Sequence, residues 1–358
     1  MIVIKIYDKN FNIITRFSEN EFDHLGYEKA INRAGSARFT VALNNPRVTE
    51  KVLQHYNRVE IVSSDRNIGD TGTVRFVGYI DTMLHTLDVV DVRCRSLIAI
   101  LGRRVLEGEH AVSGSLNTEV ESILNTINTE DDTGIEVGRL NLNNAVNKVF
   151  NNTTALSILE TFARTVDCQF EVDSNRKLNI DSELGKDLSK QVIFQYDINK
   201  KEQANILTFK TEDDGDQIVS RSYGRAVSGD NILTSTQESE EIRRKYGLLE
   251  KFNNFRVSNS QSDLDNITGS VLQENIFTLE IDLNPATTQD NFDIGDLVSV
   301  RLYNKLIRLN RNYQILQKVV QYEGKQTRIK TRISALPVSF VDSIGGINKR
   351  LELLESNI

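Results

Sequence analysis

The 358-residue sequence has no tryptophan and three prolines, and its two cysteines and four histidines supply few thiols and imidazoles for disulfide, zinc or thiol chemistry. Cys94 and Cys168 lie too far apart for a zinc or redox motif, and core packing is the expected role of both. No histidine pair has i, i+4 spacing or lies near a candidate nucleophile; the four are His24, His55, His85 and His110. We predict no metal, no cofactor and no catalytic residues, and therefore no enzyme.

Two acidic stretches resemble calcium loops in composition only. "NTEDDTGIE" at 128–136 and "KTEDDGDQI" at 210–218 lack the alternating ligands, the glycine at position 6 and the glutamate at position 12 of such loops. We predict solvated turns. A carboxylate pair for glycoside hydrolysis cannot be recognised from spacing, because the fold sets the separation, but no run of aromatic residues marks a sugar cleft.

Long hydrophobic runs are also missing. The run "SLIAIL" at 96–101 is far shorter than the roughly 20 apolar residues that cross a bilayer. The N-terminal "MIVIKIYDKN" alternates as a strand does and lacks the basic head of a signal peptide. These features predict no membrane span and assembly in the cytoplasm. The formal net charge of −7 argues against a general nucleic-acid binder, but it is compatible with DNA that passes without specific binding.

Strand patterns dominate the first 108 residues. Residues 2–8 and 12–18 predict a hairpin, a second hairpin is expected around 66–72, and a later helical turn is expected to end at Gly102. Only 47–56 has helical spacing in this part. The pattern indicates a small closed or nearly closed β domain.

The character of the sequence changes near residue 109. Apolar residues recur at helical spacing after Ser115 and again in 152–167, and a strand hairpin is expected after them, up to about residue 195. Strands return afterwards, interrupted by helical patterns at 238–251 and 262–274. The second half therefore repeats the first in outline, as a strand-rich domain with an insertion.

The C-terminal stretch "SFVDSIGGINKRLELLESNI" spaces apolar residues as a coiled coil does. Ile344 begins a 3, 4, 3, 4 pattern, and we expect oligomerisation through the positions that follow it: Ile347, Leu351, Leu354 and Ile358. Two heptads are too short to hold three chains alone, and Gly345 and Gly346 each weaken the first turn by about 1 kcal/mol. A three-helix stub and a helix packed on its own domain both stay open.

The order of several segments resembles the tail hub proteins of tailed bacteriophages, which include baseplate hub and tail-associated proteins. The resemblance extends to about residue 335. It rests on a series of short stretches: "AGSARFTVALNN", "NRVEIV", "VRFVGYIDTM", "VDVRCRSLIAILGRRV", "RKYGLLE" and "DIGDLVSVRL".

This resemblance implies a β-rich α+β fold with two antiparallel β-barrel-like domains of similar fold, an inserted α+β region and a short C-terminal helix. The expected domains are 1–108 for the first barrel, 109–195 for the inserted region with 231–284 packing on it, 196–230 plus 285–336 for the second barrel, and 337–358 for a linker and helix.

The resemblance also implies a structural function. It predicts a homotrimeric ring at the tail tip or baseplate of a virion, which joins a sixfold tail tube to a threefold tip and lets the genome pass. The implied partners are a distal tail or tube protein, a tape-measure protein and a tip or fibre protein. Two alternatives stay open: a receptor- or carbohydrate-binding tail module, and a tail-associated cell-wall hydrolase.

Overall fold

The structure is a computed structural model that describes residues 1–63, 72–142, 144–213, 218–228, 231–255, 261–269, 271–272, 277–284, 290–305, 307–323 and 326–334. The chain forms two compact units, one of Met1–Phe209 with Glu280–Ile333 and one of Lys210–Leu279. The described residues contain one sheet of thirteen strands and three smaller sheets, which confirms the β-rich α+β class.

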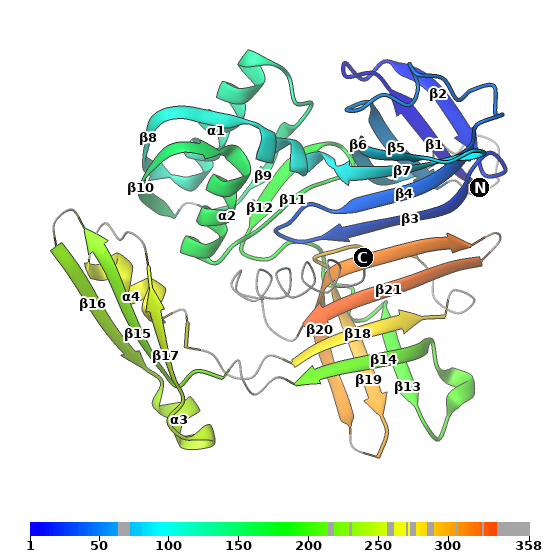
Figure 1. Cartoon of the computed structure of the whole chain (residues 1–358). Coiled ribbons are helices and arrows are strands. Elements are labelled where there is room, and N and C mark those ends of the chain that lie inside the picture. Colours follow the sequence, from blue (N-terminus) through cyan, green and yellow to red (C-terminus); the bar gives the residue numbers. More distant parts are fainter. Residues whose placement is uncertain are drawn as a thin grey trace. The chain divides into compact units, whose positions relative to one another are not determined.

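The first part of the larger unit contains seven strands and a 3₁₀ helix at Leu97–Arg103. The strands are β1 (Ile2–Tyr7), β2 (Ile13–Ser18), β3 (Asp23–Ala30), β4 (Ser36–Ala42), β5 (Arg58–Ser63), β6 (Thr73–His85) and β7 (Val89–Ser96). They are antiparallel neighbours in the order β3-β4-β7-β6-β5-β1-β2 (Figure 1). Both predicted hairpins are confirmed. In the first, the Asp8 carboxylate accepts hydrogen bonds from the N–H groups of Asn10 and Asn12 at 2.9 Å.

The helical spacing at 47–56 predicted a helix, and this prediction is wrong, because the segment forms only turns. The side chain of Asn57 donates to the carbonyl oxygens of Lys51 and Val52 at 2.8 and 3.0 Å, and so occupies groups that a longer helix would use. Val52 and Leu53 are nevertheless buried. The apolar spacing thus identified the core-facing residues without identifying the backbone conformation.

The inserted region follows as a mixture of strands and helices. It comprises β8 (Val105–Ser115), α1 (Leu116–Glu130), β9 (Glu136–Leu140), β10 (Ala145–Thr154), α2 (Ala155–Val166), β11 (Gln169–Val172) and β12 (Lys177–Asp181). Both helices and the β11–β12 hairpin are confirmed. The sequence does not anticipate β8, which pairs antiparallel with β10, or β9, which pairs parallel with β12. β8 has a mostly exposed surface, so its sequence lacks a regular apolar alternation.

The last part of the larger unit returns to strands. They are β13 (Ile193–Asp197), β14 (Ile206–Asp213), β18 (Phe277–Leu283), β19 (Leu297–Tyr303), β20 (Arg308–Glu323) and β21 (Gln326–Ser334), with a 3₁₀ turn at Lys201–Gln203. Their order is β14-β18-β21-β20-β19-β13.

Six strands of the first part and the six strands of the last part have the same neighbour order. In chain order, β1, β3, β4, β5, β6 and β7 correspond to β13, β14, β18, β19, β20 and β21. Across the sheet, the first set has the order β3-β4-β7-β6-β5-β1, and the second set has the matching order β14-β18-β21-β20-β19-β13. One difference is that β13 runs parallel to β19, whereas β1 runs antiparallel to β5. The outline repeat seen in the sequence therefore corresponds to a repeated topology.

The two parts form one continuous sheet, because β3 pairs antiparallel with β20 from Gln317 opposite Ala30 to Tyr322 opposite Leu25 (Figure 1). No closed barrel is formed by the described strands. The boundaries of the four domains expected from the sequence, and the packing of 231–284 on 109–195, stay predictions.

The smaller unit is inserted in the sequence between β14 and β18. It contains β15 (Arg221–Ser228), β16 (Asn231–Glu238), α3 (Glu240–Tyr246), β17 (Glu250–Asn254) and α4 (Gln261–Gly269). The strand order is β16-β15-β17, and both predicted helical segments are confirmed as α3 and α4. Gly224 lies against α4, where an added Cβ would be 2.0 Å from the hydroxyl oxygen of Thr268. One face of this small sheet is thus packed tightly against α4.

Candidate functional site

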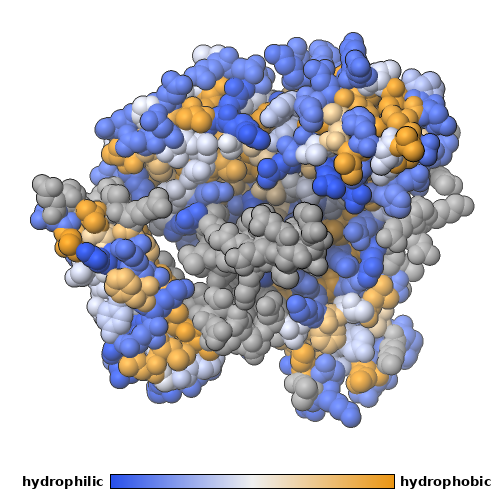
Figure 2. Space-filling model, viewed as in Figure 1, coloured by the Kyte–Doolittle hydropathy of each residue, from blue (hydrophilic) through white to orange (hydrophobic). Residues whose placement is uncertain are grey.

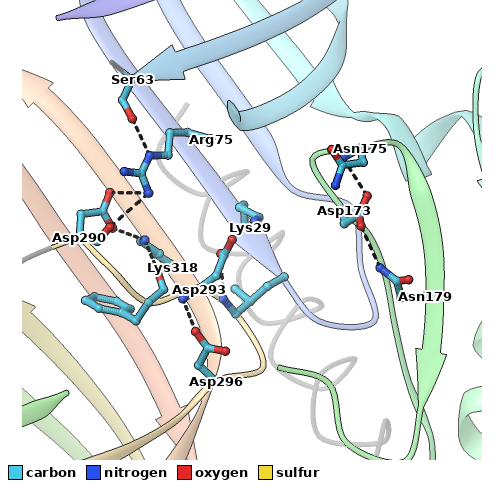
Figure 3. A network of polar contacts seen from close by, with 12 residues as sticks. Lys29, Ser63, Arg75, Asp173, Asn175, Asn179, Asp290, Asp293, Asp296 and Lys318 are labelled. Carbon is cyan, nitrogen blue, oxygen red and sulfur yellow. Dashed lines mark hydrogen bonds and ion pairs between the residues drawn. The ribbon is translucent and has the colours of Figure 1, made fainter. Parts of the chain in front are cut away.

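Charged side chains converge where the two parts of the large sheet meet, and we call Lys29, Arg75, Asp290, Asp293 and Lys318 the charged junction (Figure 3). The cations lie on β3, β6 and β20, whereas both aspartates lie in the segment 290–296 before β19. One short segment is therefore held by three strands, two from the first part of the sheet and one from the last part.

Lys318 is the most deeply buried member of the charged junction, with a side chain that is 3% exposed. Its ammonium group pairs with Asp290, donates to the carbonyl oxygen of Phe292 at 2.7 Å and lies 4.5 Å from the centre of the Phe292 ring. Removing one partner of such a buried pair leaves an uncompensated charge, which is strongly destabilising. Asp290 thus compensates the buried charge of Lys318.

Arg75 and Lys29 attach the same segment to the first part of the sheet. Arg75 Nη1 lies 3.5 Å from Oδ2 of Asp290, and Arg75 Nε donates to Ser63 Oγ at 2.6 Å. Lys29 pairs with Asp293. Burial favours a raised pKa for Asp293, but Lys29 and Lys318 outweigh it and hold this pKa below its ordinary value. The two lysines therefore favour the ionised form of Asp293.

The conformation of the segment 290–296 depends on Asp296 and on a close approach of two glycines. The Asp296 carboxylate accepts hydrogen bonds from the N–H groups of Asp293 at 2.7 Å and Lys186 at 2.8 Å. Burial raises the pKa of Asp296 even though these bonds favour its ionised form. Gly185 and Gly295 both have a φ of 86°, and an added Cβ on Gly185 would lie 2.2 Å from the carbonyl carbon of Gly295. Only glycine permits this contact between the backbones.

A buried pair of amide side chains ties the inserted region to β20. Gln169 Nε2 donates to Gln314 Oε1 at 2.7 Å, and Gln314 Nε2 donates back to Gln169 Oε1 at 2.9 Å. Gln314 Nε2 also lies within hydrogen-bond distance of the carbonyl oxygens of Leu184 (3.2 Å) and Gly295 (3.1 Å). Gln169 and Gln314 are 4% and 9% exposed, so no solvent competes for these bonds. We call them the amide pair.

Asn32 attaches β11 to the end of β3. It has a left-handed backbone with a φ of 58°, which asparagine tolerates better than most residues. Its N–H donates to the carbonyl oxygen of Phe170 at 3.0 Å, and its side-chain oxygen accepts from the N–H of Phe170 at 2.7 Å. One residue therefore reproduces both bonds of a strand pair, and the inserted region is held next to the charged junction.

Glu171 lines a small cavity of about 30 Å³ beside this attachment, together with Lys29, Arg33, Arg75 and Asp173. A space of this size holds one or two water molecules. Burial raises the pKa of Glu171 to about 7, because it outweighs the opposing effect of Lys29, and nearby aspartates raise it further. This carboxyl group therefore changes its charge near neutral pH.

The charged junction, the amide pair and Asn32 hold parts of the chain together, which is a structural role. No group of three or more His, Cys, Asp or Glu side chains that could hold a metal lies in the described ranges. Among the helices that the structure describes, none is long and apolar enough to cross a membrane. On the face shown in Figure 2, hydrophobic residues form separate patches among hydrophilic ones.

The predicted oligomerisation residues Ile347, Leu351, Leu354 and Ile358 lie outside the described residues, so their role stays a prediction. Cys94 and Cys168 are free thiols buried in the core, as expected, and burial raises the pKa of each, that of Cys168 to about 12. The residues of the charged junction and the amide pair were not singled out in the sequence. Two stretches quoted for the hub resemblance contain parts of this site: "VRFVGYIDTM" at 74–83 includes Arg75, and "DIGDLVSVRL" at 293–302 includes Asp293 and Asp296.

Comparison with known proteins shows similarity of fold without a close sequence relative. No protein-family model and no curated protein matches the chain. The prophage tail protein gp18 of Listeria monocytogenes EGD-e aligns with 98% of this chain over 99% of its own, at 15% identity and a TM-score of 0.62. The 43 kDa tail protein of prophage MuSo2 from Shewanella oneidensis aligns with 95% of this chain over 99% of its own, at 12% identity and a TM-score of 0.68.

A type VI secretion system component of E. coli, c3393, also has a similar fold. It aligns with 87% of this chain over 73% of its own, at 10% identity and a TM-score of 0.50, and is described as similar to the T4 tail proteins gp27 and gp5. The resemblance to tail hub proteins is therefore confirmed at the level of the fold.

Proposed function

We propose that the chain is a structural hub protein of a phage tail, located at the tail tip or baseplate, and that three copies form a ring. The observation that carries this proposal is the repeated strand order, which presents two similar sheet parts per chain. Three copies present six such parts, and a ring of six can contact a sixfold tube on one side and a threefold tip on the other. The similarity to tail proteins along nearly the whole chain supports the same role.

The partners in this proposal are a distal tail or tube protein, a tape-measure protein and a tip or fibre protein. The rigid attachment of the sheet parts through the charged junction and the amide pair fits a protein that transmits position between other components. The role involves no catalysis, and assembly takes place in the host cytoplasm before the protein becomes part of the virion.

The direct test is the mass and the image of the purified full-length chain. Light scattering should give three times the mass of the 40.6 kDa chain, and negative-stain images should show a ring with a central hole. A monomer at all accessible concentrations would rule out the ring as a property of the chain alone.

A second test concerns genome passage. Three copies carry a formal charge of −21, three times −7, so the assembled ring should bind duplex DNA weakly. Fluorescence anisotropy with a labelled duplex should show no tight binding at low salt. Tight binding that weakens steeply with salt would instead indicate a basic DNA-binding surface and contradict free passage.

A further inference from the structure

The joint between the two parts of the large sheet depends on the length of β20. β19 lies along one edge of β20 from Arg308 to Gln314, and β3 continues along that edge from Gln317 to Tyr322. The first part of β20 thus belongs to its own repeat, and the second part receives a strand from the other repeat.

β6 occupies the position of β20 in the first repeat and has a similar arrangement along its first half. β5 lies along β6 from Thr73 to Tyr79, as β19 lies along β20 up to Gln314. Beyond Ile80, no strand of the described chain lies along this edge of β6, while β7 pairs with its other edge up to His85. The place that β3 fills on β20 is therefore open on β6, at Thr82–His85.

β14 occupies the position of β3 in the second repeat. It pairs with β18 and forms one end of the large sheet, so its second edge has no neighbouring strand among the described residues. β3, in contrast, has β4 on one edge and β20 on the other. An unpaired edge of this kind readily accepts a strand from another chain. Each repeat thus has one strand that can pair with the other repeat and one strand edge that can accept it: β3 and β6 in the first repeat, β14 and β20 in the second. Within the chain only β3 pairs with β20, and the equivalent pairing of β14 with β6 is not made.

Exposed apolar side chains accompany both unpaired edges. Leu84 on β6 is 54% exposed, Leu87 in the adjoining turn is 96% exposed, and Leu207 on β14 is 51% exposed. In the corresponding second half of β20, Val319 is part-buried in the joint with β3. The receiving edge of β6 therefore carries an apolar residue where the internal joint covers one.

We propose that β14 of one copy pairs antiparallel with the Thr82–His85 edge of β6 of the next copy, in the manner of β3 on β20. Such strand addition supplies backbone hydrogen bonds for affinity and side-chain contacts for specificity. The contact is head-to-tail, so repeating it forms a ring when the rotation closes. The inference rests on the proposed ring and specifies the surfaces that form it.

The test uses the full-length chain and lysine substitutions, because a charged residue on a receiving edge opposes strand addition. Leu87→Lys and Leu207→Lys change exposed side chains on opposite sides of the proposed contact. Ile13→Lys is the matched control, since Ile13 is 47% exposed and lies on β2, the strand at the opposite end of the large sheet.

We expect Leu87→Lys and Leu207→Lys each to raise the dissociation constant of the assembly by roughly 10- to 100-fold, measured by light scattering over a dilution series. Ile13→Lys should assemble as the unmodified chain does. Amide hydrogen exchange provides a second measurement, in which β14 and Thr82–His85 should exchange slowly in the assembly and fast in the dissociated variants.

The outcomes separate this interface from the ring itself. A ring that persists in both variants, with fast exchange in β14, would overturn the interface and leave the ring proposal standing. Equal dissociation by Ile13→Lys would overturn the assignment of the edge. An unmodified chain that stays monomeric would overturn the ring and the interface together.

Discussion

Replacing Gln314 by leucine removes the centre of the amide pair while keeping a side chain of similar size. The substitution leaves Gln169 Nε2 without its acceptor and the carbonyl oxygens of Leu184 and Gly295 without this donor, while Gln169 Oε1 still accepts from the N–H of Leu184. Each buried polar group left without a hydrogen bond costs about 1–3 kcal/mol, and the gain from an additional buried leucine offsets part of it. We expect a net loss of about 3 kcal/mol in the free energy of unfolding.

The assay is urea unfolding of the full-length chain, followed by circular dichroism. Gln321→Leu is the control, because Gln321 lies on the same strand, β20, and is exposed; we expect a change of less than about 0.5 kcal/mol. The double variant Gln169→Leu/Gln314→Leu removes both amides, so its loss should be smaller than the sum of the single losses by about 1–3 kcal/mol. Equal effects of Gln314→Leu and Gln321→Leu, or additive single losses, would refute the role of the amide pair.

Three further predictions concern the same region and the C-terminus. Because burial raises the pKa of Glu171 to about 7, its ionisation disfavours the folded state increasingly from about pH 4.5 to 7. In urea unfolding, Glu171→Gln should therefore have a free energy of unfolding up to about 3 kcal/mol above that of the unmodified chain by pH 8, and little above it at pH 5. Glu183→Gln, at an exposed position, should show the same pH dependence as the unmodified chain. Gly185→Ala should lower the melting temperature by several degrees, since the added Cβ meets the backbone of Gly295 at a positive φ; an unchanged melting temperature would show that the segment moves aside freely. Deleting 338–358 should abolish attachment of a tip protein if Ile347, Leu351, Leu354 and Ile358 form a three-helix stub, and pull-down together with light scattering checks this; a persisting trimer with intact attachment would exclude both roles.

Local patterns in the sequence were sufficient for most elements. The alternation in β1, the apolar spacing of α1 and the turn chemistry of Asp8 each depend on residues close in sequence, and all three agree with the structure. The segment 47–56 shows the limit, because buried residues at helical spacing also fit a series of turns. β8 shows another limit, since a largely exposed strand has little apolar alternation to detect.

The candidate site was much less accessible to sequence reasoning. Lys29, Lys318 and Asp290 are ordinary charged residues in the sequence, and nothing local indicates that they meet. Gln169 and Gln314 lie 145 positions apart, and each would pass for a surface residue. Such pairs depend on how distant strands align, which side-chain type and spacing do not encode.

The sequence by itself determined that this is a β-rich chain with a repeated outline, an insertion, and few cysteines and histidines. These properties follow from composition and from side-chain periodicity along single elements. Only the tertiary structure decided that the two repeats share one strand order, that β3 crosses to β20, and that β14 and the last part of β6 each keep an edge without a described neighbour. The physical reason is that a strand's alternation indicates which face is buried, whereas its hydrogen-bonding edges carry the same N–H and C=O groups in every sequence, so the identity of the neighbouring strand is set by the fold as a whole.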